Sequence, residues 1–320
     1  MLSRVAESIY WMCRYLERAD NVARLITVNL NFILDQPTGQ REQWEPLVNI
    51  TADDAWFKQK YERADRHTVT TFLTCDRDYP NSIVSCLRAA RENARSVREV
   101  ISMEMWEYLN RFYLDVNQAV ATGTDALYAS QDFLSMIRQY GTLMAGCLDN
   151  TMSREEPWYF GRLGQLIERA DKTSRSLDVK YFHLLPSVQD VGTSIDENQW
   201  SSLLRSASGF QMYRQKYGRI APDKVVDFLL LDRNFPRAML HCVVRAEEYL
   251  HAISGAPIGS FSNAAEQRMG QLRSDLAYAS TKDILLNGLH EYLDTFQLKL
   301  NRAGEAIHDV YFALQPARAG

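Results

Sequence analysis

A short set of charged residues occurs twice in this chain with the same spacing. Glu17-Arg18-Ala19-Asp20 is followed by Arg24, and Glu168-Arg169-Ala170-Asp171 is followed by Arg175. In an α-helix, these acidic and basic side chains lie at the edge of the apolar face. Carboxylates in such a place can transfer protons, and guanidinium groups can bind an anion. The candidate catalytic residues are therefore Glu17, Asp20, Glu168 and Asp171, with Arg24 and Arg175 as candidate anion-binding residues.

The same residues also permit a structural interpretation. Partly buried charges need partners, and an ion-pair network between two helices can determine how they pack. The recurrence of the whole set favours this interpretation, and a symmetric polar pocket formed by both copies is the alternative. Four carboxylates from two helices could also bind metal ions, but helical di-metal proteins use a Glu-x-x-His spacing that these positions lack. The neighbouring arginines would compete for the carboxylates, so we predict no metal.

Four arginines form a second set, which is not repeated. They advance in steps of three and four residues along one edge of the helix that begins after Pro80: Arg88, Arg91, Arg95 and Arg98. The aligned residues of the second copy are Val244, Glu247, His251 and Ser254. Such an arginine edge can bind a phosphate, an acidic peptide or an acidic surface of a partner protein. The alternative is a solvated helix face that Glu92 and Glu99 balance.

The remaining motifs indicate structure rather than chemistry. The connector at 76–80, Asp-Arg-Asp-Tyr-Pro, recurs at 232–236 as Asp-Arg-Asn-Phe-Pro, which favours a turn between helices. Asp53-Asp54 resembles the start of an aspartate-rich magnesium motif, but Thr51 with Asp54 equally predicts a helix-capping box. The six histidines show no metal-ligand spacing, and we find no phosphate-binding glycine loop, serine elbow or dinucleotide fingerprint. We therefore predict no cofactor, and the sequence leaves open whether the protein is an enzyme.

The elements that must position these residues are helices. Apolar residues recur every three or four positions from Val5 to Ile33, and again from Ile83 to Ile101, so each segment has one apolar helical face. Further helices are predicted at about 105–121, 125–147, 158–184, 222–231, 236–253, 264–280 and 285–314. Pro, Gly, Ser and Asp gather in irregular stretches at 36–46, 149–157, 185–198 and 254–262. Strand patterns are scarce, so we predict an all-α fold.

Two motifs recur in the same order, which argues for duplication of a unit of about half the chain. The halves are residues 1–150, a first helical repeat, and residues 151–320, a second one, with their junction in the stretch 149–157. We predict two related helical bundles from this internal duplication, packed as one body and together making one compact domain.

Composition narrows the class of protein. The net charge is −4, with 36 basic and 40 acidic residues, which argues against a general nucleic-acid binder. The five cysteines have no Cys-x-x-Cys spacing and apolar neighbours, so we predict buried thiols in a reducing cytoplasm. Charges near the N-terminus argue against a signal peptide, and no window is apolar enough to span a membrane. We expect a soluble, cytoplasmic protein without a membrane partner, and an oligomer is possible.

Several separated blocks of the sequence resemble the Alpha-E family of bacterial proteins. The matching blocks are Met1-Leu2-Ser3-Arg4-Val5-Ala6-Glu7, Arg14-Tyr15-Leu16-Glu17-Arg18-Ala19-Asp20, Asp76-Arg77 through Pro80-Asn81-Ser82-Ile83, and Leu87-Arg88-Ala89-Ala90-Arg91-Glu92-Asn93-Ala94-Arg95. The family is all-helical with a recurring Glu-Arg pair, which here is Glu17-Arg18 and Glu168-Arg169. Cys13 departs mildly from the pattern, because a small residue, often glycine, is expected there.

The resemblance implies that the protein acts together with other proteins. Alpha-E proteins are found encoded beside, or fused to, ATP-grasp ligase-like proteins and transglutaminase-like peptidases, which implies a pathway that makes or trims amide bonds in a peptide-like product. Our first hypothesis is an accessory or binding protein that acts with the ATP-grasp-type ligase or the transglutaminase-like peptidase and binds the ligase, an acidic peptide or a phosphate through the arginine edge. The second is an enzyme of that pathway, with a polar Glu/Asp/Arg pocket between the halves. A purely structural or oligomerisation module is the third.

Overall fold

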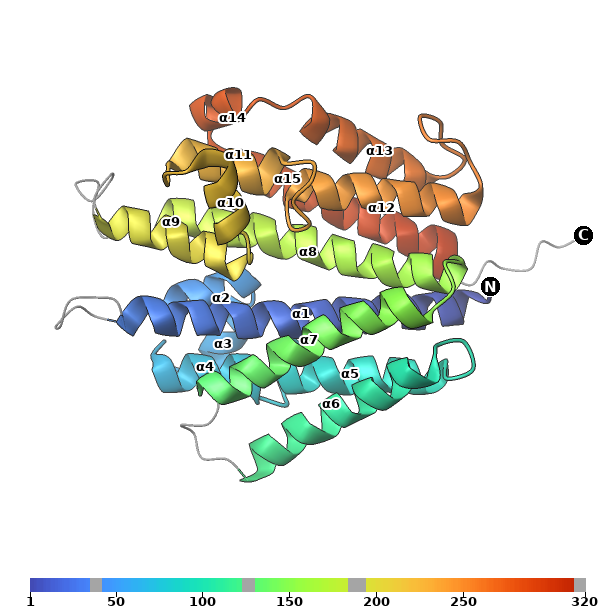
Figure 1. Cartoon of the computed structure of the whole chain (residues 1–320), viewed down its shortest axis with the longest axis horizontal. Coiled ribbons are helices and arrows are strands. Elements are labelled where there is room, and N and C mark those ends of the chain that lie inside the picture. The colour runs from blue at the N-terminus through green and yellow to red at the C-terminus, as the bar shows by residue number, and fades with distance from the viewer. Residues whose placement is uncertain (35–41, 123–129, 184–193, 314–320) are drawn as a thin grey trace, which may run out of the picture.

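The computed structural model describes residues 1–34, 42–122, 130–183 and 194–313, which are helical almost throughout (Figure 1). The helices of the N-terminal half are α1 (Ser3–Leu34), α2 (Glu45–Thr51), α3 (Asp54–Lys60), α4 (Arg66–Thr74), α5 (Ile83–Ser96), α6 (Met103–Thr122) and α7 (Gln131–Thr151). Those of the C-terminal half are α8 (Glu156–His183), α9 (Ser194–Ser206), α10 (Phe210–Tyr217), α11 (Pro222–Leu231), α12 (Met239–Ser254), α13 (Ala264–Ala277), α14 (Thr281–Asn287), α15 (Leu289–Ile307) and the π-helix η2 (His308–Phe312). The described residues contain no β-strand, so the predicted all-α fold is confirmed.

The long helices were predicted and several short ones were not. Helices α2, α3, α4 and α10 are too short for an apolar period to stand out. Helix α9 has 13 residues but few apolar ones, and part of it lies in the stretch 185–198 that was predicted to be irregular. The helix predicted at about 285–314 is present as α15 continued by η2, but it begins later than predicted, because Gly288 adopts a φ of 109° and separates α14 from α15. Residues 35–41 and 184–193, in two of the predicted irregular stretches, lie outside the described residues.

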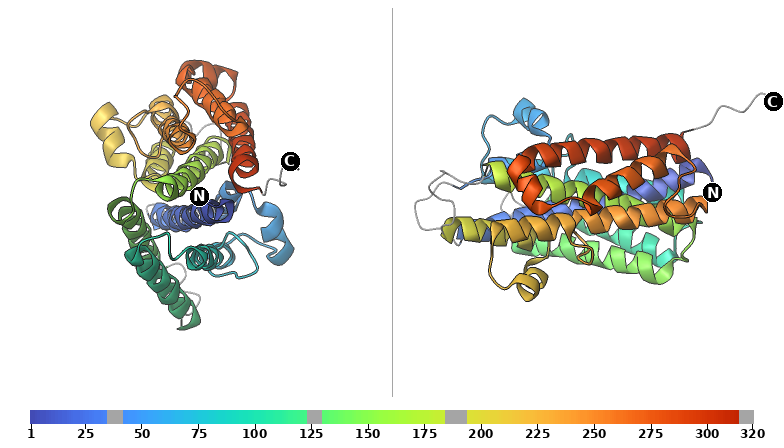
Figure 2. Two further views of the ribbon diagram at one scale, coloured as in Figure 1. Left: turned by 90° about the vertical axis from the view of Figure 1, so that its right-hand side faces the viewer. Right: turned by 90° about the horizontal axis from the view of Figure 1, so that it is seen from above.

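Helices α1 and α8 run side by side through the middle of the molecule. Most other helices of the N-terminal half lie on one side of this pair, and those of the C-terminal half lie on the other (Figure 2). They are parallel, because the Met1 amine binds Glu156 at 2.8 Å at their N-terminal ends while Arg18 binds Glu168 at 2.7 Å near their centres. Gly164 permits this close approach, since a Cβ built on it would lie 2.3 Å from the backbone oxygen of Tyr10.

The apolar side chains form two cores, and α1 contributes to both. Ile9, Met12 and Leu16 pack in the core of the N-terminal half. Ala6 and Tyr10, on another face of α1, pack in the core of the C-terminal half. Trp158 of α8 in turn packs in the core of the N-terminal half. Each core therefore contains residues of the other half, which makes the two halves one packed body. Where a boundary between the repeats 1–150 and 151–320 should be drawn stays a prediction.

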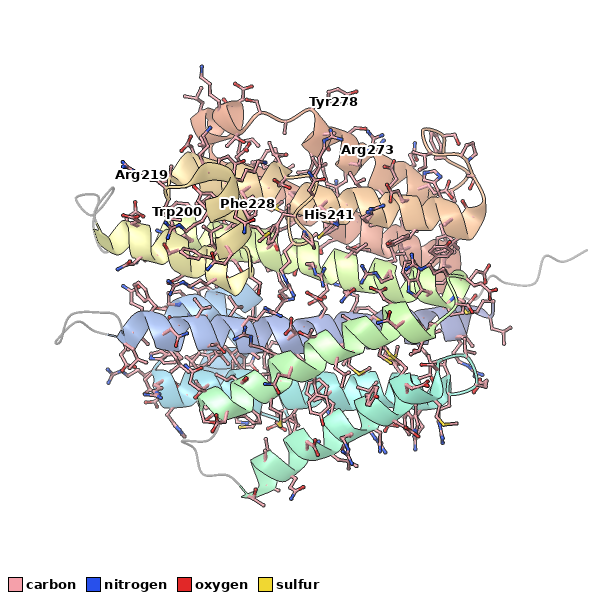
Figure 3. All side chains as sticks on the ribbon, in the orientation of Figure 1. Trp200, Arg219, Phe228, His241, Arg273 and Tyr278 are labelled. Carbon is pink, nitrogen blue, oxygen red and sulfur yellow. The ribbon has the colours of Figure 1, made fainter. Side chains whose placement is uncertain are left out.

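Equivalent contacts occur in the two halves. Phe57, Tyr61, Phe72 and Tyr79 form an aromatic cluster whose ring centroids are 3.9 to 6.1 Å apart. Tyr213, Tyr217, Phe228 and Phe235 form the same chain of contacts at 4.5 to 6.3 Å, and Phe228 is labelled in Figure 3. Beside these clusters, Lys60 binds Asp76 at 2.9 Å and Lys216 binds Asp232 at 2.7 Å. The contacts agree with the predicted pair of related halves, while their origin by duplication stays a prediction.

The structure bears on the predictions about membrane-spanning helices and about the cysteines. None of the described helices has a stretch long and apolar enough to span a membrane. None of the five cysteines, which all lie in the described part of the chain, forms a disulfide: Cys13, Cys86, Cys147 and Cys242 are buried, and Cys75 is half-buried. Burial raises the pKa of Cys13, Cys86 and Cys242 to about 12, so these thiols are unreactive at neutral pH.

Candidate functional site

The first Glu-Arg set meets the second where α1 and α8 cross the centre of the molecule. Glu17 of α1 is 4% exposed and accepts hydrogen bonds from Nε and Nη2 of Arg169 on α8, at 3.0 and 2.8 Å. Arg237, after the recurring Pro236 connector, donates to Glu17 at 2.8 Å and to Asp20 at 3.1 Å. Although burial opposes ionisation, Arg169 and Arg237 hold the pKa of Glu17 well below its usual range.

Glu168 of α8 is bound in the reciprocal manner. Its side chain is fully buried and accepts hydrogen bonds from Arg18 at 2.7 and 2.9 Å and from Arg14 at 3.0 Å, with Lys172 3.7 Å away. Burial again opposes ionisation, yet Arg18 and Arg14 hold the pKa of Glu168 well below its usual range. Each Glu-Arg pair of the sequence is therefore split, with the glutamate of one helix binding the arginine of the other.

This geometry limits what the two glutamates can do. A carboxylate that stays ionised throughout the neutral range and whose oxygens accept several guanidinium hydrogen bonds is a poor general acid and a weak base. The arrangement favours the ion-pair interpretation for Glu17 and Glu168, in which the four charges determine the register of α1 against α8.

Asp20 and Asp171, the other two candidate carboxylates, have different surroundings. Asp171 binds Arg175 at 2.9 Å and Lys172 at 3.1 Å. Burial raises the pKa of Asp171, but the charges of Lys172 and Arg175 outweigh burial and lower this pKa overall. Asp20 binds Arg24 at 2.7 Å through Oδ2, while its buried Oδ1 has no hydrogen-bond partner. Asp20 thus keeps a free acceptor oxygen.

A cavity of about 170 Å³ opens beside Asp20, between α1, α7 and α8. Its polar lining consists of Glu17, Asp20, Arg24, Thr142, Gln165, Arg169 and Arg237. Glu168, Asp171 and Arg175 are absent from that lining. The cavity therefore holds Glu17, Asp20 and Arg24 of the first copy but only Arg169 of the second, which does not match the symmetric pocket considered from the sequence.

The four arginines predicted as one helical edge lie against α6 and solvent: Arg88, Arg91 and Arg95 on α5, and Arg98 in the turn that follows it. Arg91 is half-buried, donates to Asn110 at 2.8 Å and lies 4.9 Å from the centre of the Tyr113 ring. Arg98 lies 4.7 Å from the Trp106 ring, and Arg95 binds Glu92 at 2.7 Å. Arg88, Arg95 and Arg98 are exposed, while Arg91 and Arg98 both contact α6.

Arg14 and Arg237 are the functional-site residues that the sequence analysis missed. Arg14 precedes the repeated set by one helical turn, so it has no counterpart in the motif. Arg237 occupies the position directly after Pro236, as Asn81 does after Pro80, and Asn81 accepts a hydrogen bond from Arg18. A polar residue after each recurring proline was the available signal.

Two minor motifs have structural explanations. Helix α2 ends at Thr51, so the predicted capping box of Thr51 with Asp54 is wrong. Asp53 instead accepts hydrogen bonds from the Tyr79 hydroxyl at 2.5 Å and from Asn81 at 3.0 Å, which holds the 76–80 connector. Among the described residues, Asp178, His290 and Asp294 bring three potential ligand atoms within 4.8 Å of one another, with His290 bound to Asp178 at 2.7 Å. This group is half-buried to exposed and lies away from the Glu-Arg network.

Comparisons with known proteins point to one family. The Alpha-E model, described as a predicted alpha-helical domain with a conserved ER motif, matches residues 1–312. An uncharacterized protein of Mycobacterium bovis and one of Mycobacterium tuberculosis are each 25% identical to the chain over 342 aligned positions, which cover 99% of this chain. The chain spans about 37% of the length of these relatives. No solved structure is significantly similar to it.

Proposed function

The chain belongs to the Alpha-E family, and on that premise we propose that it is an accessory binding protein rather than a catalyst. It acts with an ATP-grasp-type amide ligase or a transglutaminase-like peptidase in the synthesis or processing of a peptide-like product. The observation that carries this proposal is the double Glu-Arg exchange, because Glu17 and Glu168 are both bound by guanidinium groups of the opposite helix. Carboxylates bound in this way stabilise a scaffold and do little chemistry.

The partner surface that fits this role is the arginine edge of α5. Arg88 and Arg95 are exposed on α5, which packs in the N-terminal half, and Arg98 is exposed in the turn after it. Guanidinium groups on an ordered helix bind acidic surfaces with little loss of conformational freedom. The mycobacterial relatives support a role beside other domains, because the matched region makes up only about 37% of their longer chains.

Copurification tests this proposal. An ATP-grasp-type ligase and a transglutaminase-like peptidase of the kind encoded beside Alpha-E proteins are coexpressed with this protein, which is captured through a tag. We expect the wild type to retain a neighbour and the double variant Arg88→Glu, Arg95→Glu to lose it, with an unchanged helical circular dichroism spectrum. Arg245→Glu is the matched control, because Arg245 is also exposed and binds a glutamate three residues away, at 2.6 Å. Retention of the neighbour by the double variant would contradict the proposal.

One observation favours the alternative of an enzyme. The buried Oδ1 of Asp20 has no hydrogen-bond partner, and Asp20 lines the cavity of about 170 Å³ together with Arg24 and Arg237. In that case Asp20 would accept a proton from a substrate that the two arginines hold. Asp20→Asn would then abolish turnover in a reconstituted pathway while the protein stays folded, and unchanged turnover would exclude Asp20 as the base.

A further inference from the structure

A second, wider groove lies along the last third of α1. At the left of Figure 1, α7 and α9 flank this part of α1, and α10 follows α9. The groove has a volume of about 500 Å³, which is within the usual range for small-molecule sites. Its lining residues are Arg24, Thr27, Val28, Asn31, Arg138, Ser202, Arg205, Ser208, Phe210 and Gln211.

The lining is strongly basic. It contains three arginines, from α1, α7 and α9, and no carboxylate. Arg24 shares the carboxylate of Asp20, at 2.7 Å. Among the described residues, no carboxylate forms an ion pair with Arg138 or Arg205, and Arg205 lies 4.9 Å from the Phe210 ring instead. The groove therefore has an excess of positive charge that the protein does not neutralise.

Arg138 is half-buried, has no ion-pair partner among the described residues, and feels the charge of Asp20 only as a weaker contribution than that of Arg24. Its Nε is shielded from solvent and has no hydrogen-bond partner in the structure. Burial of Arg138 and the neighbouring charge of Arg24 lower the pKa of Arg138. A buried N–H donor without an acceptor costs about 1–3 kcal/mol, so it needs an explanation. A ligand that accepts this hydrogen bond supplies one.

The turn between α9 and α10 shows backbone strain at the same groove. Ser208 has a φ of 54°, which is unusual for a residue other than glycine, and only Ala52 shares this property among the described residues. Its hydroxyl accepts a hydrogen bond from Nη1 of Arg24. Strained residues of this kind gather at ligand sites, where the surrounding structure holds them in place. Here the strain places a hydroxyl beside the guanidinium groups.

We propose that this groove binds a phosphate monoester of a small organic molecule, with the phosphate held between Arg24 and Arg138 and with Arg205 at the rim. A phosphate is favoured over a single carboxylate because it carries up to two charges and three acceptor oxygens, which suits several guanidinium groups. The remaining volume and the Phe210 ring accommodate the organic part. This site goes beyond the partner surface on α5, since it lies on other helices and takes a small molecule.

Titration calorimetry on the isolated protein tests the site with three probes: O-phosphoserine, inorganic phosphate and glutarate. We expect O-phosphoserine to bind more tightly than inorganic phosphate, and glutarate to bind most weakly. Arg138→Gln should weaken O-phosphoserine binding at least tenfold, and Arg205→Gln should weaken it less. Arg95→Gln, on the α5 edge, should leave it unchanged.

Thermal unfolding separates a binding role from a structural one. Because the protein supplies no acceptor for Arg138 Nε, Arg138→Gln should unfold at the same temperature as the wild type or higher. Absence of O-phosphoserine binding to the wild type, binding unchanged by Arg138→Gln, or glutarate or inorganic phosphate binding as tightly as the monoester would each overturn the proposal. A large drop in the unfolding temperature of Arg138→Gln would do so as well. No partner protein is present, so a failure here is distinct from failure of the copurification.

Discussion

At the scale of single residues, the exchange of partners between α1 and α8 is the dominant feature. Glu168 is fully buried among Arg14, Arg18 and Lys172, and Glu17 is enclosed by Arg169 and Arg237. A buried ion pair gives little net stability over an apolar pair, but removing one partner leaves an uncompensated charge in the interior. These residues therefore specify how the helices pair and make the protein sensitive to their loss.

The first prediction concerns the loss of one buried carboxylate. Glu168→Gln should lower the free energy of unfolding by about 3–5 kcal/mol, because Arg14 and Arg18 then lack their counter-charge, while Lys172 keeps Asp171. Glu248→Gln is the control, since Glu248 pairs with Arg245 at the surface, where such a pair contributes about 0–1 kcal/mol. Urea unfolding followed by circular dichroism measures both. Equal losses in the two variants would contradict the network's importance.

The second prediction concerns pH. Glu17, Glu168 and Asp171 have folded-state pKa values below those of the unfolded chain, so the folded state binds fewer protons. The stability that they provide is fully present above about pH 4.5 and is lost as the pH falls, by about 1.4 kcal/mol per pH unit for each carboxylate. The urea midpoint should therefore fall steeply below pH 4.5. Glu168→Gln should show a shallower dependence on pH, and an identical slope in both proteins would exclude Glu168 as a source of it.

At the scale of elements, the closeness of α1 and α8 depends on glycine. A Cβ built on Gly164 would lie 2.3 Å from the backbone oxygen of Tyr10, and one built on Gly161 would lie 3.1 Å from Sγ of Cys13. The first contact is with backbone, which cannot rotate away as a side chain can. The ion pairs form at their observed lengths only while the two helices stay this close.

Gly164→Ala should separate α1 from α8 and lower the free energy of unfolding by about 1–3 kcal/mol, the usual cost of overpacking. Gly304→Ala is the matched control, because a Cβ on Gly304, also inside a helix, has no atom within 4 Å. Alanine there should stabilise the protein by about 0.5–1 kcal/mol, since it favours the helix. Thermal unfolding measures the stability of both variants. A Gly164→Ala protein more stable than the wild type would contradict the close contact between Gly164 and Tyr10.

At the scale of the whole molecule, the two cores share a helix. Ala6 and Tyr10 of α1 pack with the C-terminal half, while Ile9 and Met12 of the same helix pack with the N-terminal half. Two halves that share a helix in this way cannot open independently. The predicted repeats 1–150 and 151–320 are thus interdependent in their packing, even though each resembles the other in its aromatic cluster and its turn.

Unfolding of the complete chain should follow one cooperative transition, because loss of either half exposes part of the core of the other. Residues 151–320 expressed alone should lack fixed tertiary structure, since Glu168 then has neither Arg14 nor Arg18. Calorimetry of the complete chain and amide proton dispersion in the NMR spectrum of the fragment test this. Two separate calorimetric transitions, or a well-dispersed fragment spectrum, would show that the halves fold independently.

The sequence alone determined the class of fold and the set of charged residues. Long apolar periods specify amphipathic helices locally, so α1, α5, α8 and α12 were predictable, and the repeated Glu-Arg spacing identified Glu17 and Glu168 as a pair. Short helices such as α3 and α10 were not predictable, because one or two turns carry too few apolar positions and are stabilised by the neighbours against which they pack.

Only the tertiary structure decided which charge binds which. Glu17 and Arg18 are adjacent in the chain, yet they point to different partners on α8, because a helix turns about 100° per residue. The two repeats differ in that Asp20 lines the cavity of about 170 Å³ and Asp171 does not, which depends on α7 crossing α1 and which no local pattern encodes. The uncompensated charge of Arg138 likewise exists only because helices distant in the chain enclose it. The spacing of residues along the chain determines which of them share a helical face. Packing between helices that are distant in sequence determines which side chains that face contacts.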